Sequence, residues 1–390
     1  MFDAIVNRGA FWSLLAQRVV YALNWYNVAS IFSLMAVEFG QGVSGLGALT
    51  SSFYLGAGLF QIPGGVVAAR FGPRLTAIFG TLLMSVAVLI SATALQFDVV
   101  VLARFFVGAG MAFVFAPGIV LITQYFRRGA EGLGVGLYIS AYQAGGMVGL
   151  FGWVVVATTI GWRLSLIASG MLGVFTAVAL FVLVPREDTT TRPRVGVPEL
   201  RRVLLDRHLL LLGVVATGLS MGSILVSSFV VYYLIKALGV VPALAGAVGS
   251  LVFLVPIFSS PIGGRLYDRR KNFKTTVALA GVVSALATVM AGFGGIYGPV
   301  ISALLGGFVS GLGFTIVMSA ARESRAMGPE YRTLSVAWVN SISLTSSFVP
   351  PIFFSFLAEI LGYSAAWIGG GVLAFLLIIP IVLLREPSST

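Results

Sequence analysis

Twelve long apolar runs, separated by short polar loops, constrain the fold of this chain more than any other feature. The runs cover residues 10–37, 45–68, 75–95, 99–125, 133–157, 163–184, 208–235, 242–264, 275–296, 298–320, 333–358 and 364–384. Each run is close to the roughly 20 residues that an α-helix needs to cross a bilayer. The chain is 58% hydrophobic and only 9% charged, whereas soluble domains carry about 25% charged residues. We therefore predict an all-α membrane protein with twelve transmembrane helices.

The positive charge of the chain, +11 net, is concentrated at the two ends and in alternate loops. Among the lysines and arginines, only Arg18, Arg104, Arg163 and Lys236 lie elsewhere. Loops rich in lysine and arginine stay on the cytoplasmic side of a membrane protein. The pattern predicts a multi-pass protein of the cell membrane with both termini in the cytoplasm. It also explains the basic charge without a nucleic-acid partner.

A polar stretch at residues 185–207 divides the runs six and six. We expect a bundle of six helices over residues 1–184, a cytoplasmic linker over 185–207, and a second bundle over 208–390. The last run of each half begins in a similar way, with GWRLSLIASG at 161–170 and GYSAAWIGGG at 362–371. Many secondary transporters are built from such repeats, with the substrate site between the halves.

A glycine pair followed by basic residues also occurs once in each half. Residues 60–74 read FQIPGGVVAARFGPR, and residues 259–274 read SSPIGGRLYDRRKNFK. We expect the chain to turn at Pro63-Gly64-Gly65, because glycine adopts turn conformations readily and lets helices approach closely. In the same way, Pro350-Pro351 should break or bend the eleventh helix, because proline lacks the backbone N–H of a helix interior.

These segments resemble motifs of the major facilitator superfamily. GGVVAARFGPR and GGRLYDRR are similar to its loop pattern Gly-x-Leu-x-Asp-Arg-x-Gly-Arg-Arg, and LARFFVGAG at 102–110 resembles its fourth-helix motif. The run SSFYLGAGLFQIPGGVVAARFGPR looks most like the branches of anion:cation symporters, nitrate carriers and oxalate/formate exchangers. The resemblance implies a conformational role for Gly65, Arg70, Gly72, Arg74, Arg104, Gly108, Gly264, Asp268 and Arg269.

Two positions depart from the family pattern. The motif aspartate is replaced by Ala69 in the first half and kept as Asp268 in the second. The resemblance implies that Asp268 latches the cytoplasmic side by facing a helix N-terminus, where an anion is stabilised; the alternative is a solvated loop acid. In the first helix, Asn24 and Trp25 stand where the anion:cation branch has an Asp-Arg pair before the asparagine that corresponds to Asn27. The anion-binding arginine of that branch is therefore missing from its usual place.

Arginines, and no acids, lie inside the predicted spans. Every aspartate and glutamate falls at the end of a run or in a loop, which argues against a carboxylate proton relay. Arg18 lies about 12 Å into the first helix, where it and Tyr21 could hold an anion; alternatively, its side chain reaches out to lipid phosphate. Arg104 lies near the outer end of the fourth helix, where a structural role is favoured over substrate contact. The candidate substrate-binding residues are Arg18, Tyr21, Asn24, Asn27, Gln143, Tyr232 and Asn340.

Several of these candidates have a second interpretation. Asn340 is suited to bond either a substrate or a neighbouring helix, and Tyr232 is suited to an outer gate or to the aromatic belt at the membrane interface. In the fifth helix, Gly132 with Gly136 and Gly145 with Gly149 form small-xxx-small pairs that permit close helix contact.

The sequence favours a transporter over an enzyme. It has no cysteine and a single histidine, His208, which excludes cysteine or histidine metal clusters, and it contains none of the common nucleotide-binding or hydrolase motifs. We expect no cofactor and no metal, and partners limited to a small-molecule solute and membrane lipids, with the protein acting as a monomer. The leading hypothesis is a secondary transporter of a small anion that works by alternating access. The alternatives are an exporter of apolar or amphipathic compounds and a non-transporting protein such as a lipid scramblase.

Overall fold

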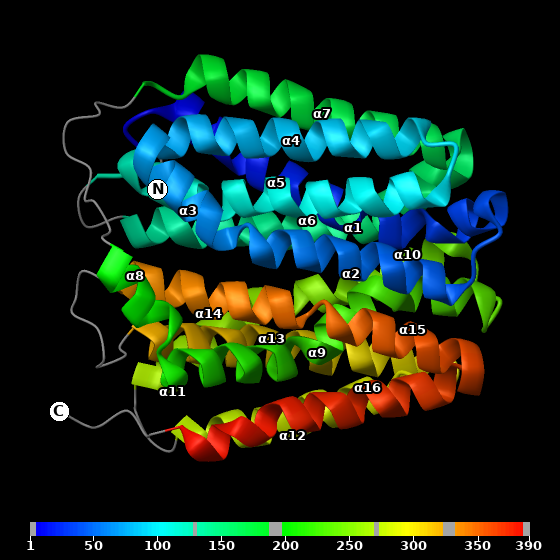
Figure 1. Ribbon diagram of the computed structural model, residues 1–390. Coiled ribbons are helices and arrows are strands. Elements are labelled where there is room, and N and C mark those ends of the chain that lie inside the picture. Colours follow the sequence, from blue (N-terminus) through cyan, green and yellow to red (C-terminus); the bar gives the residue numbers. More distant parts are fainter. Residues whose placement is uncertain (1–4, 128–130, 187–196, 269–272, 323–331, 385–390) are drawn as a thin grey trace.

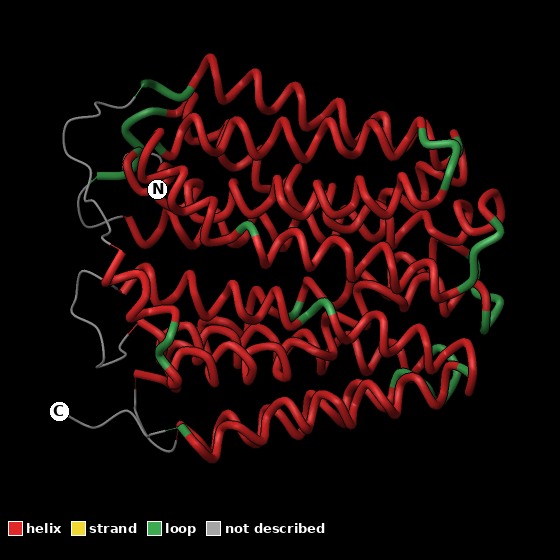
Figure 2. Tube along the Cα trace, viewed as in Figure 1, coloured by secondary structure: helices red, strands yellow, loops and turns green. Residues whose placement is uncertain are grey.

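The computed structural model describes residues 5–127, 131–186, 197–268, 273–322 and 332–384, and this part of the chain is almost entirely helical (Figures 1 and 2). Within these ranges, extended backbone pairs only in an isolated bridge between Ile5 and Phe126. The helices are α1 (Arg8–Phe39), α2 (Val43–Leu59), α3 (Gln61–Phe71), α4 (Pro73–Thr93), α5 (Phe97–Gln124), α6 (Glu131–Ile160), α7 (Trp162–Leu183), α8 (Val197–Leu204), α9 (Arg207–Lys236), α10 (Pro242–Leu254), α11 (Pro256–Asp268), α12 (Phe273–Met290), α13 (Tyr297–Arg322), α14 (Arg332–Ser346), α15 (Val349–Leu361), α16 (Tyr363–Ile378) and the 3₁₀ helix η4 (Ile379–Leu383).

The helices confirm the predicted membrane spans. Within the described ranges, eleven helical segments are long and apolar enough to cross a bilayer, and the pair α2 and α3, bent by 42°, makes a twelfth. The bend lies at Phe60, three residues before Pro63. A proline inside a helix removes one hydrogen bond and its ring clashes with the carbonyl four residues earlier, here Leu59. The bend in this span therefore follows from its sequence.

Proline also breaks two spans of the second half. The eleventh span is interrupted between Ser346 and Val349, immediately before Pro350-Pro351, as predicted. The eighth span is interrupted between α10 and α11, where Pro256 begins the second piece. In contrast, the run at 275–296 was predicted too long, since α12 ends at Met290 and the chain then turns through Gly294 and Gly295, both at positive φ.

The spans assemble into two groups that lie side by side in Figure 1, α1 to α7 in one and α9 to η4 in the other. The start of α1, the end of η4 and the short helix α8 lie at the same end of the molecule. The outward surface of α7 is apolar, with Phe175, Val178, Phe181 and Val182 all more than half exposed. Apolar surface of this extent is expected where lipid, rather than water, surrounds a helix.

The glycine pairs do not turn the chain, contrary to the expectation from the sequence. Gly64 and Gly65 lie inside α3, and the chain turns at Gly72, whose φ of 94° is strained for any residue with a Cβ atom. The first glycine of each pair instead permits close packing. A Cβ atom on Gly64 would lie 2.8 Å from the carbonyl oxygen of Ala112 on α5. Gly263 makes the equivalent approach to Leu312 on α13, so the sequence repeat is also a repeat of packing.

Two seams join the bundles toward the end where α1 terminates. In the first, α2 packs on α14 and α15: the Ser51 hydroxyl donates to the Phe348 carbonyl oxygen at 2.7 Å, and Gly47 leaves no room for a side chain beside Ser355. In the second, α6 packs on α10, where a Cβ atom on Gly246 would lie 3.0 Å from the Leu150 carbonyl oxygen.

Toward the opposite end the described contacts are sparser. A Cβ atom on Gly65, Gly132 or Gly136 would meet no described atom within 4 Å. The glycine pair Gly145 and Gly149 of α6 packs against α1, as predicted for a small-xxx-small pair. A Cβ atom on Gly145 would lie 2.6 Å from the Val19 carbonyl oxygen.

Candidate functional site

Arg18 lies inside the first bundle, surrounded by aromatic rings. Its side chain is only 5% exposed, so it does not reach out to the lipid surface. The guanidinium carbon lies within 4.4–5.0 Å of the ring centres of Tyr21 on its own helix, Phe115 on α5, and Tyr138 and Tyr142 on α6. Each cation–π contact stabilises a desolvated cation by about 2 kcal/mol. Such contacts replace only part of the hydration that the cation loses on burial.

The hydrogen-bonding capacity of this cluster is largely unused. Nε and Nη1 of Arg18 are buried and have no hydrogen-bond partner among the described residues, although the side chain does pair with Tyr21. The Tyr138 hydroxyl is also buried and unpartnered within the described ranges. It lies directly against Gly118 on α5, where a Cβ atom would collide with it. Three buried donors without acceptors at one place make a site suited to an anion.

The helical repeat and close packing together bring these side chains to one place. Arg18, Tyr21 and Trp25 are spaced by three and four residues on α1, and therefore share one face. Tyr138 and Tyr142 are spaced by four on α6 in the same way. The two faces meet because Gly145 lets α6 approach α1. A hydrogen bond of 2.6 Å between the Tyr26 and Tyr142 hydroxyls fixes the contact. We call Arg18, Tyr21, Phe115, Tyr138 and Tyr142 the aromatic cage.

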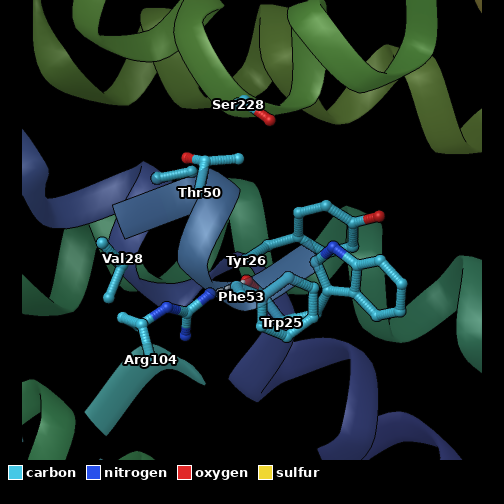
Figure 3. Close-up of a pocket in the computed structure, with 8 residues that line it drawn as sticks. Trp25, Tyr26, Val28, Thr50, Phe53, Arg104 and Ser228 are labelled. Atoms are coloured by element: carbon cyan, nitrogen blue, oxygen red, sulfur yellow. Dashed lines mark hydrogen bonds between the residues drawn. The ribbon is translucent and has the colours of Figure 1, made fainter. Parts of the chain in front are cut away.

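Arg104 is the second buried cation, and its environment differs from that of Arg18 (Figure 3). Nη1 donates to the Asn24 carbonyl oxygen at 3.1 Å and to Asn27 Oδ1 at 3.2 Å, and Nη2 donates to the Trp25 carbonyl oxygen at 3.0 Å. The ring of Phe53 on α2 lies 4.8 Å from its guanidinium carbon. Arg104 thus ties α5 to α1 through neutral acceptors, as a structural arginine does.

Asn24 and Asn27 bond to helix α7. The Ser169 hydroxyl donates to Asn24 Oδ1 at 2.9 Å, and Asn27 Nδ2 donates to the Ser169 hydroxyl at 3.2 Å. Asn24 also donates to the Val20 carbonyl oxygen of its own helix. These bonds use the polar atoms of both asparagines for packing α1 on α7 and α5. Their predicted contact with a substrate stays a prediction.

The other sequence candidates are spread over the molecule. Gln143 is half-buried on α6, next to Tyr142 of the aromatic cage. Tyr232 on α9 packs against Phe32 with ring centres 5.2 Å apart, about 21 Å along α1 from Arg18 at 1.5 Å per residue. Asn340 is buried on α14, and its neighbour Ser341 donates to the Gly58 carbonyl oxygen of α2. The structure therefore brings Arg18 and Tyr21 together and leaves Tyr232 outside that region, and the contact of Gln143 with a substrate stays a prediction.

Among the motif residues, Arg74 has the most definite contacts. It is buried, and its Nε donates to the Val184 carbonyl oxygen at 2.7 Å while Nη2 donates to the carbonyl of Phe181, so it caps the C-terminus of α7. Arg70 is exposed and lies over the ring of Phe71. A Cβ atom on Gly108 would collide with the carbonyl oxygen of Phe53, so this glycine permits the packing of α5 on α2.

The remaining motif positions are less constrained. Gly264 has only Thr315 nearby, at 3.9 Å from an added Cβ atom. The Asp268 side chain and Arg269 lie outside the described part of the chain, so the latch expected there stays a prediction.

Sequence reasoning missed three members of the cage, Phe115, Tyr138 and Tyr142. The spacing of two tyrosines by four residues in LYISAYQ was a usable signal, since it places both on one helix face. Phe115 carried no such signal, because only the packing of α5 shows which of its many phenylalanines faces Arg18.

Over the described residues, no group of three or more potential metal ligands occurs.

The helical architecture can now be compared with known proteins. The family model described as Major Facilitator Superfamily matches residues 14–328 and 210–390. The chain belongs to the major facilitator superfamily. Two solved structures have a similar fold. One is a bacterial homologue of the human lysosomal transporter Spinster in an inward-facing, occupied conformation, with a TM-score of 0.70 and 18% identity over 96% of this chain and 94% of the other. The second is a D-xylose–proton symporter, with a TM-score of 0.73 and 14% identity over 96% of this chain and 98% of the other. This superfamily member is thus a multi-pass integral membrane protein.

The curated relatives align with a smaller share of this chain than the two solved structures do. The chain is 31% identical over 146 residues to the probable L-galactonate transporter of Escherichia coli (strain K12), covering 37% of this chain and 32% of that protein. It is 30% identical over 187 residues to the lincomycin resistance protein of Streptomyces lincolnensis (46% and 38%), and 25% identical over 250 residues to the nitrite extrusion protein of Bacillus subtilis (strain 168) (63% and 61%). The matches therefore span 32% to 61% of the length of these three relatives.

Proposed function

We propose that this protein carries a small organic or inorganic anion across the cell membrane by alternating access, and that Arg18 binds the anion. The observation that carries the proposal is the pair of unpartnered nitrogens on a cation that is only 5% exposed. Leaving a charged group buried without partners costs several kcal/mol, because the hydration it loses is not replaced. An anionic solute supplies the missing acceptors and the opposite charge.

The charge balance of the interior favours an anion over a cation. Among the described residues, the buried charged side chains are Arg18, Arg74 and Arg104, all cationic. A cationic solute at the same depth would need a carboxylate partner, and intramembrane charges generally occur with such partners. Arg74 and Arg104 bond to backbone carbonyl groups, which leaves Arg18 as the buried cation with the most unused donors.

The names of the relatives agree with this proposal. The relatives include a probable L-galactonate transporter, a probable sulfoacetate transporter and a nitrite extrusion protein. Each of these solutes is an anion at neutral pH, since carboxylic, sulfonic and nitrous acids all ionise below pH 7.

The seams between the bundles support a state that is closed at one end. The contacts of Gly47 with Ser355 and of Ser51 with Phe348 lie toward the end where α1 terminates, whereas Gly65, Gly132 and Gly136 face open space toward the other. The exposed arginines Arg201 and Arg202 of α8 lie at that second end. By the positive-inside rule that end faces the cytoplasm, so the structure corresponds to an inward-facing state in this proposal.

An exporter of amphipathic compounds is the second candidate. The aromatic walls of the cage favour it, because flat apolar molecules stack on such rings. Two relatives also have names of this kind, a lincomycin resistance protein and an agnestins efflux protein. In that case the positive charge of Arg18 would have no partner on the solute, which makes the anion carrier the better supported function.

A ligand-dependent shift in thermal unfolding tests the proposal directly. The purified protein in detergent is heated with galactonate, sulfoacetate, nitrite or lincomycin, each alongside the variant Arg18→Ala. The control variant is Arg201→Ala, which removes an exposed arginine from α8. A ligand at 100 times its dissociation constant stabilises the folded state by about 2.7 kcal/mol. We expect an anion to raise the unfolding temperature of the parent and of Arg201→Ala, and to leave Arg18→Ala unchanged.

Flux of the stabilising solute into sealed proteoliposomes then completes the test. Uptake in the parent and its loss in Arg18→Ala support an anion carrier. Stabilisation by lincomycin alone, unchanged in Arg18→Ala, would instead favour the exporter. Binding without any flux would favour a non-transporting member of the superfamily.

A further inference from the structure

Arg104 lines a small cavity between the two bundles that the aromatic cage does not use. The cavity measures about 10 Å³, and its lining residues are Trp25, Tyr26, Val28, Ala29, Thr50, Phe53, Arg104 and Ser228. Arg104 is 4% exposed, and its Nε has no hydrogen-bond partner within the part of the chain that is described. In Figure 3 the arginine lies on the side of the first bundle, with Thr50 beyond it and Ser228 across from both on α9.

The lining combines one cation with hydroxyl groups and apolar walls. Thr50 on α2 and Ser228 on α9 each contribute a hydroxyl, and Trp25 and Phe53 contribute rings. The residues that line the cavity include no aspartate or glutamate. The acceptors that Arg104 does bond, two backbone carbonyls and an asparagine oxygen, are neutral. The positive charge at this depth is therefore solvated by dipoles but not balanced.

We propose that this cavity binds a single small inorganic monoanion of halide size, held by Arg104 and the hydroxyls of Thr50 and Ser228. The volume is close to that of one water-sized occupant, which excludes organic solutes and polyatomic dianions such as sulfate. A single cation balances a single negative charge. Hydroxyls serve an anion as donors, and an aromatic ring that turns its edge toward the cavity offers partial positive charge.

Binding at this place couples the ion to the arrangement of the bundles. Thr50 and Arg104 belong to the first bundle and Ser228 to the second, so the complete site exists only while the two are in contact here. A ligand shifts a conformational equilibrium toward the state that binds it better. The ion therefore stabilises the state in which the end of the molecule beyond the cavity is closed, whichever solute the aromatic cage accepts.

Halide-dependent thermal unfolding of the solute-free protein tests the inference. The purified protein is melted in a concentration series of sodium chloride and, in parallel, in sodium sulfate of equal ionic strength, because sulfate is too large for the cavity. The variants are Thr50→Val, which replaces a hydroxyl by a methyl group of similar size, and Ser228→Ala. The matched control is Ser227→Ala, because the Ser227 hydroxyl donates to the Ile224 carbonyl oxygen of its own helix and does not line the cavity.

We expect a saturable rise in unfolding temperature with chloride for the parent and for Ser227→Ala. Loss of one hydroxyl donor raises the half-saturating chloride concentration about fivefold in Thr50→Val and in Ser228→Ala. The rise must also persist in Arg18→Ala, because that residue belongs to a different site. A rise that disappears in Arg18→Ala and persists in Ser228→Ala would place the ion in the aromatic cage and overturn the inference. Equal melting in chloride and sulfate would show that the cavity holds water only, and would overturn the inference as well.

Discussion

The guanidinium carbon of Arg18 lies 4.6 Å from the centre of the Tyr142 ring, although the two residues are 124 positions apart in the chain. Tyr142 in turn shares a 2.6 Å hydrogen bond with Tyr26, one of the residues that line the cavity beside Arg104. The ring centre of Phe253 on α10 lies 6.2 Å from the ring centre of Tyr142. The Tyr142 ring therefore connects the aromatic cage to the contact between the bundles.

The ring of Tyr142, more than its hydroxyl, should stabilise the buried charge of Arg18. We expect Tyr142→Leu to lower the free energy of unfolding by about 1–2 kcal/mol beyond Tyr142→Phe, because leucine has no π-system for a cation–π contact. Thermal unfolding in detergent without solute measures the difference. Equal unfolding temperatures for the two variants would show that the ring face contributes nothing to Arg18.

The hydroxyl of Tyr138 should affect stability and binding in opposite directions. A buried hydroxyl without a partner costs about 1–3 kcal/mol, so Tyr138→Phe is expected to leave the solute-free protein as stable as the parent or more stable. If the hydroxyl donates to the bound anion, the same change weakens anion binding about fivefold. Calorimetric titration with the stabilising anion, together with thermal unfolding, measures both effects. The control is Tyr297→Phe, at an exposed position. Unchanged anion affinity in Tyr138→Phe would show that the Tyr138 hydroxyl does not bind the anion.

The two glycine pairs provide matched tests of helix packing. Gly64→Ala should cost about 1–3 kcal/mol because the new Cβ atom lies 2.8 Å from the Ala112 carbonyl oxygen. Gly65→Ala has open space, and it should stabilise α3 by about 0.5–1 kcal/mol, since alanine favours the helix. The same contrast is expected between Gly263→Ala and Gly264→Ala in α11. Unfolding temperatures of the four variants decide the matter, and a destabilised Gly65→Ala would contradict the role of packing.

Arg74 should stabilise the end of α7 through its planar guanidinium. Its Nε and Nη2 bond two different carbonyl groups, those of Val184 and Phe181. A lysine keeps the charge but cannot reproduce this geometry, so Arg74→Lys is expected to cost about 2 kcal/mol, as for the loss of one charge-assisted bond. Hydrogen exchange of the last turn of α7 should rise in the same variant. Arg202→Lys, at an exposed position of α8, should change neither property.

The membrane spans followed from the sequence because lipid leaves the backbone few choices. A segment in hydrocarbon must satisfy its own hydrogen bonds, so a run of about 20 apolar residues becomes a helix wherever it lies. Pro63 and Pro350-Pro351 mark breaks for an equally local reason, the missing N–H of proline. The glycine pairs were misjudged for the opposite reason: glycine permits a turn but does not require one, and the neighbouring helices α5 and α13 decide that Gly64 and Gly263 pack instead.

The site was predictable only in part. Arg18 and Tyr21 could be selected from the sequence because an arginine inside an apolar run is costly unless it has a function or partners. The sequence favoured a structural role for Arg104 only through its resemblance to the fourth-helix motif, because both residues are arginines within apolar runs. The tertiary structure distinguishes them by their neighbours. Helix α1 offers carbonyl oxygens to Arg104, whereas α5 and α6 offer rings to Arg18 and leave its Nε and Nη1 unpartnered among the described residues. Local chemistry thus determined the helices and their breaks, and the packing of distant helices determined which acceptors each buried cation meets.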